Sequence, residues 1–195
     1  MEVLSAIHDR FDQFLERCKA LYDEKSVQDI CRAIEFSKEI LDNKTFDSGE
    51  IMLEHSLEVA SIIAEEIGLE SDSVVTGILH NVMYPHLEKR ATSGLITEQF
   101  GQSVSQILEG MAKINALGTD TVDLYSENYR MLMLALAGDV RVIIIKIADR
   151  LQVMRNFDRY PSPAVARVTS ETSHLYAPLA HRLGLYKINS ELQDL

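Results

Sequence analysis

Apolar residues recur at helical spacing along most of this chain, and no run alternates between apolar and polar residues with a period of two. The most constraining segment is 49–67. Leu53 and Leu57 lie on one face of a helix through this segment, and Val59 and Ile62 lie on another. A helix that is apolar on two sides is buried on both, so we expect it to be central. The pattern predicts an all-α fold, a single domain of about eight to ten helices.

Caps, glycines and prolines predict where the helices begin and end. An amphipathic helix covers about 2–21, and the pattern Ser26-Val-Gln-Asp predicts a second helix that Ser26 caps and that ends in the turn at 42–44. We expect Gly68 to end the central helix and Ser71 to cap a short apolar helix after it.

Pro85 must end or kink this short helix, which places His80 and Asn81 in its last turn. Residues 84–96 are expected to form a loop. Later helices are predicted over about 97–113, 123–137 and 140–157, and from a cap at Ser162 onward.

One apolar run allows two interpretations. Residues 142–148 are apolar enough for a buried strand, but Lys146, Asp149 and Arg150 continue at helical spacing, which favours a helix. We find neither an internal repeat nor a second core. The expected organisation is an N-terminal helix, residues 1–24, followed by one helical domain, residues 25–195.

The net charge is −11, from 19 Lys and Arg against 30 Asp and Glu. Because binding nucleic acid requires a basic surface, this charge argues against a nucleic-acid partner. Residues 140–195 are the exception, with eight basic residues against five acidic ones. Such a region could face a phosphorylated small molecule, although a solvated face without function is the commoner meaning.

The sequence also indicates the compartment. No stretch approaches the about 18 apolar residues of a membrane span, and the N-terminus is acidic and amphipathic rather than a signal peptide. Both cysteines, Cys18 and Cys31, fall in helical patterns and are expected to be reduced core thiols. We therefore expect a soluble cytoplasmic protein without a membrane partner.

Polar residues interrupt the apolar pattern at three places: His55 on the central helix, His80-Asn81, and Asp149. Histidines and carboxylates that converge from several helices can hold a divalent metal, which lowers the pKa of a bound water. Each residue also has a structural interpretation. A single histidine in a helix is more often a hydrogen-bonded core residue, and Asp149 could form an ion pair with Lys146 or Arg150.

Three runs carry a resemblance to a known family: GILHNV, ENYRMLMLALAGDVRVIIIKIADRLQVMR and YAPLAHRLGLYKINSELQDL. They resemble the N-terminal hydrolase region of the RelA/SpoT family, enzymes of the stringent response that make and destroy ppGpp and pppGpp. This region belongs to the HD superfamily of metal-dependent phosphohydrolases. The resemblance extends from about Val27 to Leu195 and implies a manganese ion held at four positions, here His55, His80, Asn81 and Asp149.

The chain departs from the family pattern inside this implied site. Asn81 replaces an aspartate, and Asn is a poorer ligand for Mn²⁺ than a carboxylate. Tyr84 and Pro85 replace an acidic pair that acts on the attacking water, and neither can serve as a general base at neutral pH. Val153 replaces an asparagine that helps to seat the nucleotide, and Met52 replaces an aromatic residue.

The turn before the central helix departs as well, because Phe46 and Asp47 stand where the family carries basic residues. A negative Asp47 repels a guanosine that carries two pyrophosphates. The departures predict a catalytically degenerate hydrolase domain without a bound cofactor. His55, His80 and Asp149 are then vestigial ligands, hydrogen-bonded to one another or to water.

The resemblance also implies a longer parent. The family places an alarmone synthetase domain directly after the last of the three runs, and these residues contain no phosphate-binding loop. We therefore expect a fragment of a GTP pyrophosphokinase in which this domain packs on the synthetase domain and regulates it.

Two alternatives stay open. The domain could be an active Mn²⁺-dependent (p)ppGpp 3′-pyrophosphohydrolase. It could also sense ppGpp or GTP without cleaving it, with Ser48, Lys146, Arg150 and Arg155 as remnant nucleotide contacts.

Overall fold

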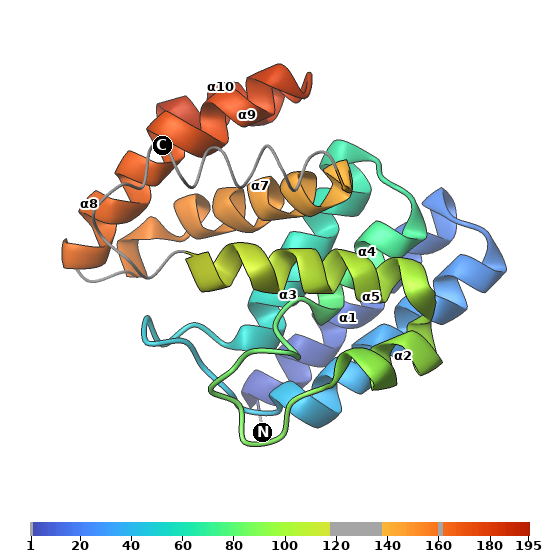
Figure 1. The fold of residues 1–195 in the computed structure, drawn as a ribbon. Helices are drawn as coiled ribbons and strands as arrows, with labels where there is room; N and C mark the ends of the chain where they lie inside the picture. The colour runs from blue at the N-terminus through green and yellow to red at the C-terminus, as the bar shows by residue number, and fades with distance from the viewer. Residues whose placement is uncertain (1, 118–137, 160–161) are drawn as a thin grey trace. The chain divides into compact units, whose positions relative to one another are not determined.

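A computed structural model describes residues 2–117, 138–159 and 162–195 (Figure 1). Across these residues the chain is helical and forms no strand; the one extended pairing is an isolated antiparallel bridge between Thr45 and Ile51. The predicted all-α fold is confirmed. No helix in the described ranges combines the length and the apolar character that crossing a membrane requires.

The chain divides into two compact units, and each is described separately. The first unit comprises Met1–Phe46 and Glu50–Leu108, and the second comprises Asp47–Gly49 and Glu109–Leu195. The predicted division into residues 1–24 and 25–195 stays a prediction.

The first unit is built around the predicted central helix. This helix runs as α3, Met52–Ser61, and continues without interruption into a π-helical segment, Ile62–Ile67. Its buried residues include Leu53, Leu57, Val59 and Ile62, so the helix is covered on both apolar faces, as predicted. The other helices are α1 (Glu2–Leu21), α2 (Glu24–Leu41), α4 (Ser71–Leu79) and the start of α5 (Ser93–Leu117); α4 packs on α3 and α2, and α1 packs on α2 and α3 (Figure 1).

The predicted caps of two helices are wrong. Asp23, not Ser26, caps α2, because its carboxylate accepts the backbone N–H of Ser26 at 2.8 Å. Ser71 is the first residue of α4 rather than its cap. Gly68 ends the central helix as predicted, in the left-handed conformation with φ of 77°.

The connection between α4 and α5 is placed differently from the prediction. Helix α4 ends at Leu79, well before Pro85, so that His80 is its C-cap and Asn81 lies one residue beyond. Helix α5 begins at Ser93, one turn earlier than predicted, because Thr92 accepts the N–H of Leu95 with its hydroxyl and that of Ile96 with its carbonyl. Gly101, with φ of 87°, breaks the helical conformation inside α5.

The second unit contains the helices that follow. Residues 140–155 form the helix predicted over 140–157, not a strand, and the Asp139 carboxylate caps it by accepting the N–H of Arg141. The predicted helix over 123–137 lies outside the described residues. The elements are α7 (Val140–Arg155), a 3₁₀ turn (Phe157–Arg159), α8 (Ser162–Glu171), a π-helical segment (Thr172–Tyr176), α9 (Ala177–Arg182) and α10 (Tyr186–Asp194) (Figure 1).

The prediction of two core thiols is half wrong. Neither cysteine forms a disulfide; Cys18 is buried, but Cys31 is exposed. The buried stripe of α2 passes through Ile30, Ile34 and Leu41. Position 31 is rotated by about 100° from position 30 on the helix, which places Cys31 at the edge of this stripe.

Candidate functional site

His55 lies on the buried face of α3, beside a second buried polar side chain. Its Nδ1 is 3.4 Å from a carboxylate oxygen of Glu50, and both side chains are almost fully buried. The Phe46 ring packs edge-on against the His55 ring, with centroids 5.1 Å apart. The backbone holds Phe46 in this position, because its N–H donates to the Glu50 carbonyl at 2.9 Å.

His80 is oriented by the end of its own helix. Its Nδ1 lies 2.6 Å from the carbonyl oxygen of Gly77. Because a carbonyl can only accept, Nδ1 carries the proton, and the Nε2 of the neutral ring is left as an acceptor. The His80 and His55 rings are neighbours, with centroids 5.3 Å apart.

Asn81 is buried, and it is the hydrogen-bond donor to the Nε2 acceptor of His80. Its side-chain amide donates to His80 Nε2 at 2.9 Å and to the Ser56 hydroxyl at 3.2 Å. An ionised carboxylate at position 81 could make neither bond as a donor. The structure thus brings three of the sequence-predicted residues, His55, His80 and Asn81, together in the first unit.

The contacts of His55, His80 and Asn81 can be compared with those of side chains that bind a metal. A histidine that binds a metal through Nε2 donates from Nδ1 to a carboxylate or a backbone carbonyl. His80 does so to the Gly77 carbonyl, whereas His55 Nδ1 approaches the Glu50 carboxylate only to 3.4 Å. Asn81 departs from this arrangement, because its amide donates to the lone pair that a metal would take from His80. The first unit keeps the hydrogen bond that orients His80 as a ligand, but it lacks the carboxylate beside that histidine.

Of the other substituted positions, Met52, Tyr84 and Pro85 belong to the first unit and Asp47 to the second. Tyr84 is half-buried and its ring packs against His86, while Pro85 is exposed. Met52 is buried in the core, so it offers no surface to a nucleotide base. Asp47 is exposed.

Asp149 lies on α7 in the second unit, where it forms an ion pair. Lys146 Nζ is 2.7 Å from Asp149 Oδ2 and also donates to Asn115 Oδ1 at 3.0 Å. Burial lowers the pKa of Lys146, but the nearby Asp149 and Tyr176 outweigh it and hold this pKa above its ordinary value. The expected ion pair of Asp149 with Lys146 is present, and the role of Asp149 as a metal ligand stays a prediction.

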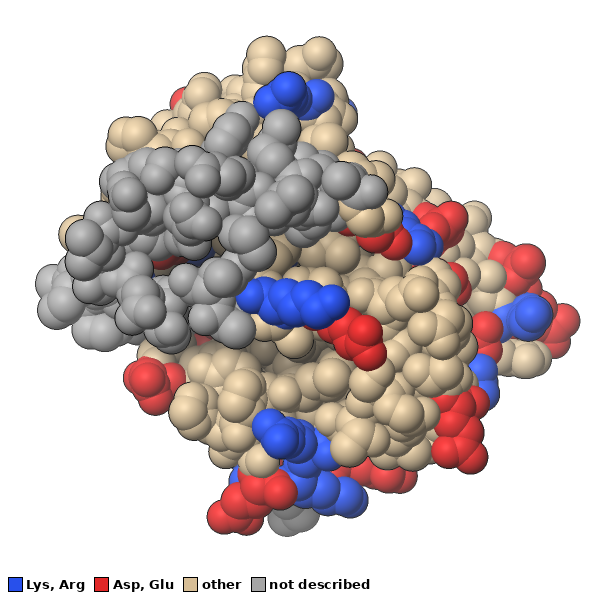
Figure 2. Space-filling model, in the orientation of Figure 1, with Lys and Arg blue, Asp and Glu red and all other residues tan. Residues whose placement is uncertain are grey.

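The other predicted phosphate contacts are also paired within the second unit. Arg150 binds Glu171 at 2.5 Å and stacks over the ring of Tyr176, with 4.5 Å to the centroid. Arg155 forms a bidentate pair with Glu191, at 2.6 and 2.8 Å, and this hydrogen bonding lowers the pKa of Glu191. On the face drawn in Figure 2, acidic and basic side chains are interspersed.

Sequence reasoning missed three groups that lie against the predicted residues: the Glu50 carboxylate, the Ser56 hydroxyl and the Gly77 carbonyl. Glu50 and Ser56 carry a weak signal, since both are polar and lie close to His55 in an apolar segment. The Gly77 carbonyl carries none, because every residue has a backbone oxygen.

Comparison with known proteins adds to this geometry. Residues 33–186 match the family model described as the HD domain. The chain is 38% identical over 170 residues to a GTP pyrophosphokinase of Myxococcus xanthus, covering 85% of this chain and 22% of that protein. It is 34% identical over 183 residues to a guanosine-3′,5′-bis(diphosphate) 3′-pyrophosphohydrolase of Aquifex aeolicus, covering 94% and 25%.

A third relative is the bifunctional (p)ppGpp synthase/hydrolase SpoT of Escherichia coli, 31% identical over 186 residues, which cover 95% of this chain and 26% of that protein. The chain therefore spans about a quarter of the length of these relatives.

Proposed function

Because this chain is an HD domain of the RelA/SpoT family, we propose that it is a catalytically degenerate (p)ppGpp hydrolase domain that acts as a scaffold or regulator. The observation that carries the proposal is the hydrogen bond from the Asn81 amide to His80 Nε2. This bond satisfies, within the protein, the nitrogen that a metal would need. A site of this kind is stable without an ion.

The charge of the ligand set supports the proposal. In an active member of the family, a manganese ion would supply an activated water for attack on the phosphate. Here the histidines His55 and His80 remain, and Asp149 is counted as a ligand position from its sequence motif alone. Asn81 removes one of the two carboxylate charges, which weakens binding of a hard divalent cation.

The groups that would move protons are also missing. Tyr84 and Pro85 occupy the positions of the acidic pair, and Pro85 has no ionisable group. Loss of general acid–base assistance costs about 10²–10⁴ in rate. Even with a metal bound, these residues offer no base for the attacking water.

Ion pairs within the protein also weaken the binding of a nucleotide substrate. Lys146, Arg150 and Arg155, the predicted phosphate contacts, each have a carboxylate partner. A nucleotide would have to displace these partners, several of which are partly buried. This pairing gives a nucleotide sensor less support than a scaffold.

The proposal also includes a longer parent chain around this domain. The relatives are about four times as long as this chain, and one of them is named a GTP pyrophosphokinase. We place this domain in a parent chain of that kind, with the synthetase domain as its partner.

The proposal is tested by the release of pyrophosphate from ppGpp. The purified 195-residue protein is incubated with ppGpp and Mn²⁺, beside the hydrolase relative of Aquifex aeolicus as a positive control. We expect no release above the rate without protein. Release at a rate within tenfold of the control enzyme would refute degeneracy.

The same assay decides the second candidate, an active hydrolase, which the names of the hydrolase relatives favour. In that case release must stop on chelation of the metal and in a His55→Gln variant. A triple variant, Asn81→Asp, Tyr84→Glu and Pro85→Asp, restores the three acidic groups. We expect it to release more pyrophosphate than the wild-type protein in the presence of Mn²⁺.

A further inference from the structure

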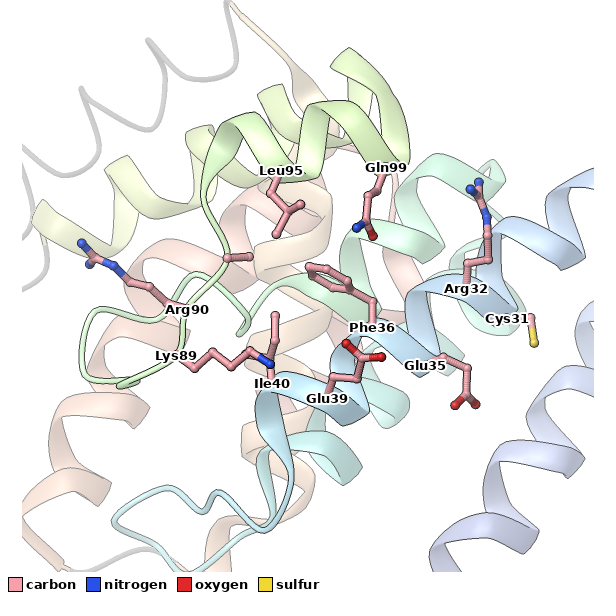
Figure 3. A pocket seen from close by; sticks show the side chains of 11 residues that line it. Cys31, Arg32, Glu35, Phe36, Glu39, Ile40, Lys89, Arg90, Leu95 and Gln99 are labelled. Carbon is pink, nitrogen blue, oxygen red and sulfur yellow. The ribbon is translucent and has the colours of Figure 1, made fainter.

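A groove of about 480 Å³ lies on the first unit, away from the histidine pair. It is bounded by α2, by the start of α5 and by the loop that precedes α5 (Figure 3). The lining includes the apolar residues Phe36, Ile40 and Leu95 and the charged residues Glu39, Lys89 and Arg90.

The groove has the length and spacing of a site for a helix. Arg32, Phe36 and Ile40 follow one another on α2 at four-residue spacing, and Leu95 and Gln99 do the same on α5. The α2 wall from residue 31 to residue 40 is about 13 Å long, since a helix rises 1.5 Å per residue. Side chains at i, i+4 and i+7 of a bound helix span about 10.5 Å, so they fit along this wall.

The floor of the groove is apolar. Ile40 and Ala91 are buried, and the Phe36 ring packs edge-on against Phe100, with centroids 5.4 Å apart. Leu95 is among the most exposed large apolar residues in the described part of the chain, with 36% of its surface accessible. A cover over Leu95 and Phe36 would remove apolar surface from water, which favours association.

The edges of the groove differ in charge. Lys89 and Arg90, on the loop edge, are the only Lys or Arg residues between positions 45 and 112, a segment otherwise rich in acidic residues. Both are exposed, and no ion pair among the described residues includes either of them. Glu39, on the α2 edge, likewise takes part in no ion pair within the described ranges, whereas Glu35 pairs with Lys38.

We propose that this groove binds an amphipathic helix of a partner protein, with acidic residues along the flank that meets Lys89 and Arg90. The apolar stripe of that helix covers Phe36, Ile40 and Leu95, and its opposite flank is neutral or basic beside Glu39. Two edges of opposite charge fix the rotation of the bound helix about its axis. The inference does not depend on whether the domain hydrolyses ppGpp.

The test uses a display library of helical peptides, selected on the 195-residue protein. We expect enriched peptides to carry apolar residues at i, i+4 and i+7 with an acidic flank on one side. Their affinity should fall at least tenfold in a Lys89→Glu, Arg90→Glu double variant. The control variant, Lys25→Glu and Lys44→Glu, makes the same change in net charge at exposed positions outside the groove and should bind as the wild type does.

A second readout locates the bound peptide. Cys31 lies at the end of the groove and is exposed, whereas Cys18 is buried, and burial raises the pKa of its thiol to about 11. A thiol reagent at pH 8 therefore modifies Cys31 in the folded protein. Enriched peptides should slow this reaction severalfold.

Three results would overturn the proposal. The first is a library that yields no enrichment over the bare support. The second is a set of enriched peptides that bind the Lys89→Glu, Arg90→Glu variant as well as the wild type. The third is binding that leaves the rate of Cys31 modification unchanged.

Discussion

Replacing Asn81 by Asp should destabilise this domain without metal and make its stability depend on Mn²⁺. Asn81 is buried, and its amide donates to His80 Nε2 at 2.9 Å and to the Ser56 hydroxyl at 3.2 Å. An ionised Asp cannot donate to either group. The Ser56 hydroxyl can rotate and donate to the new carboxylate, so the principal loss is the bond to His80.

The size of the effect follows from this single buried acceptor. A buried polar group without its hydrogen bond costs about 1–3 kcal/mol. For a chain of this length, 1 kcal/mol corresponds to about 2–4 °C in melting temperature. We therefore expect the melting temperature of the Asn81→Asp variant to lie about 2–12 °C below that of the wild type in a chelating buffer.

Mn²⁺ should reverse this loss in the variant, because the carboxylate and the His80 nitrogen can then both bind the ion. A ligand at about 100 times its Kd stabilises the folded state by about 2.7 kcal/mol. Thermal unfolding of both proteins, with and without Mn²⁺, measures the effect.

The matched control is Asn156→Asp at the end of α7. This variant also removes an amide donor, in this case to the Gln152 carbonyl at 3.0 Å. It should respond to Mn²⁺ no more than the wild type does. Equal stability of Asn81→Asp and the wild type in chelator, or equal stabilisation of the wild type by Mn²⁺, would contradict the expected role of the Asn81 amide.

Two further predictions concern stability. In Gly77→Ala the new Cβ would lie 2.6 Å from the Ile63 side chain, and overpacking of about 1–3 kcal/mol should exceed the gain of about 1 kcal/mol in helix propensity. Gly94→Ala, where nothing lies within 4 Å, should instead stabilise by about 0.4–1 kcal/mol; denaturant titrations that give both variants the same sign would contradict this account. The hydrogen bond from the Arg141 side chain lowers the pKa of the Asp139 carboxyl, so its stabilising effect is present above the unfolded-state pKa and is lost as the pH falls through the lower folded-state value. Asp139→Asn should therefore be less stable than the wild type at pH 7, and the difference should shrink as the pH falls below the folded-state pKa of Asp139. A difference that stays constant into acid would count against the assignment.

The helices themselves could be predicted, because their signal is local. The apolar residues of segment 49–67 indicated a central helix, and α3 is buried on both faces. The caps were harder to predict, since both Asp23 and Ser26 are good N-cap residues three positions apart, and only the backbone geometry distinguishes the cap from the residue it binds. The sequence also does not decide whether a residue at the edge of a buried helix face is itself buried. Cys31 lies just outside the buried face of α2 and is exposed.

The candidate site could also be predicted only in part. The sequence shows that Asn81 replaces a carboxylate and that His80 lies beside it. The donation from Asn81 to His80 Nε2 could not be predicted, because it depends on the tautomer that the Gly77 carbonyl imposes.

By itself, the sequence determined the helical fold class, the family resemblance and the positions where the ligand set departs from it. These properties depend on residue identity and on spacing within a few turns. Only the tertiary structure decided which polar group each side chain meets, such as Arg155 with Glu191, 36 residues apart. Long side chains have several rotamers and several neighbours, and packing of the helices selects one partner among them.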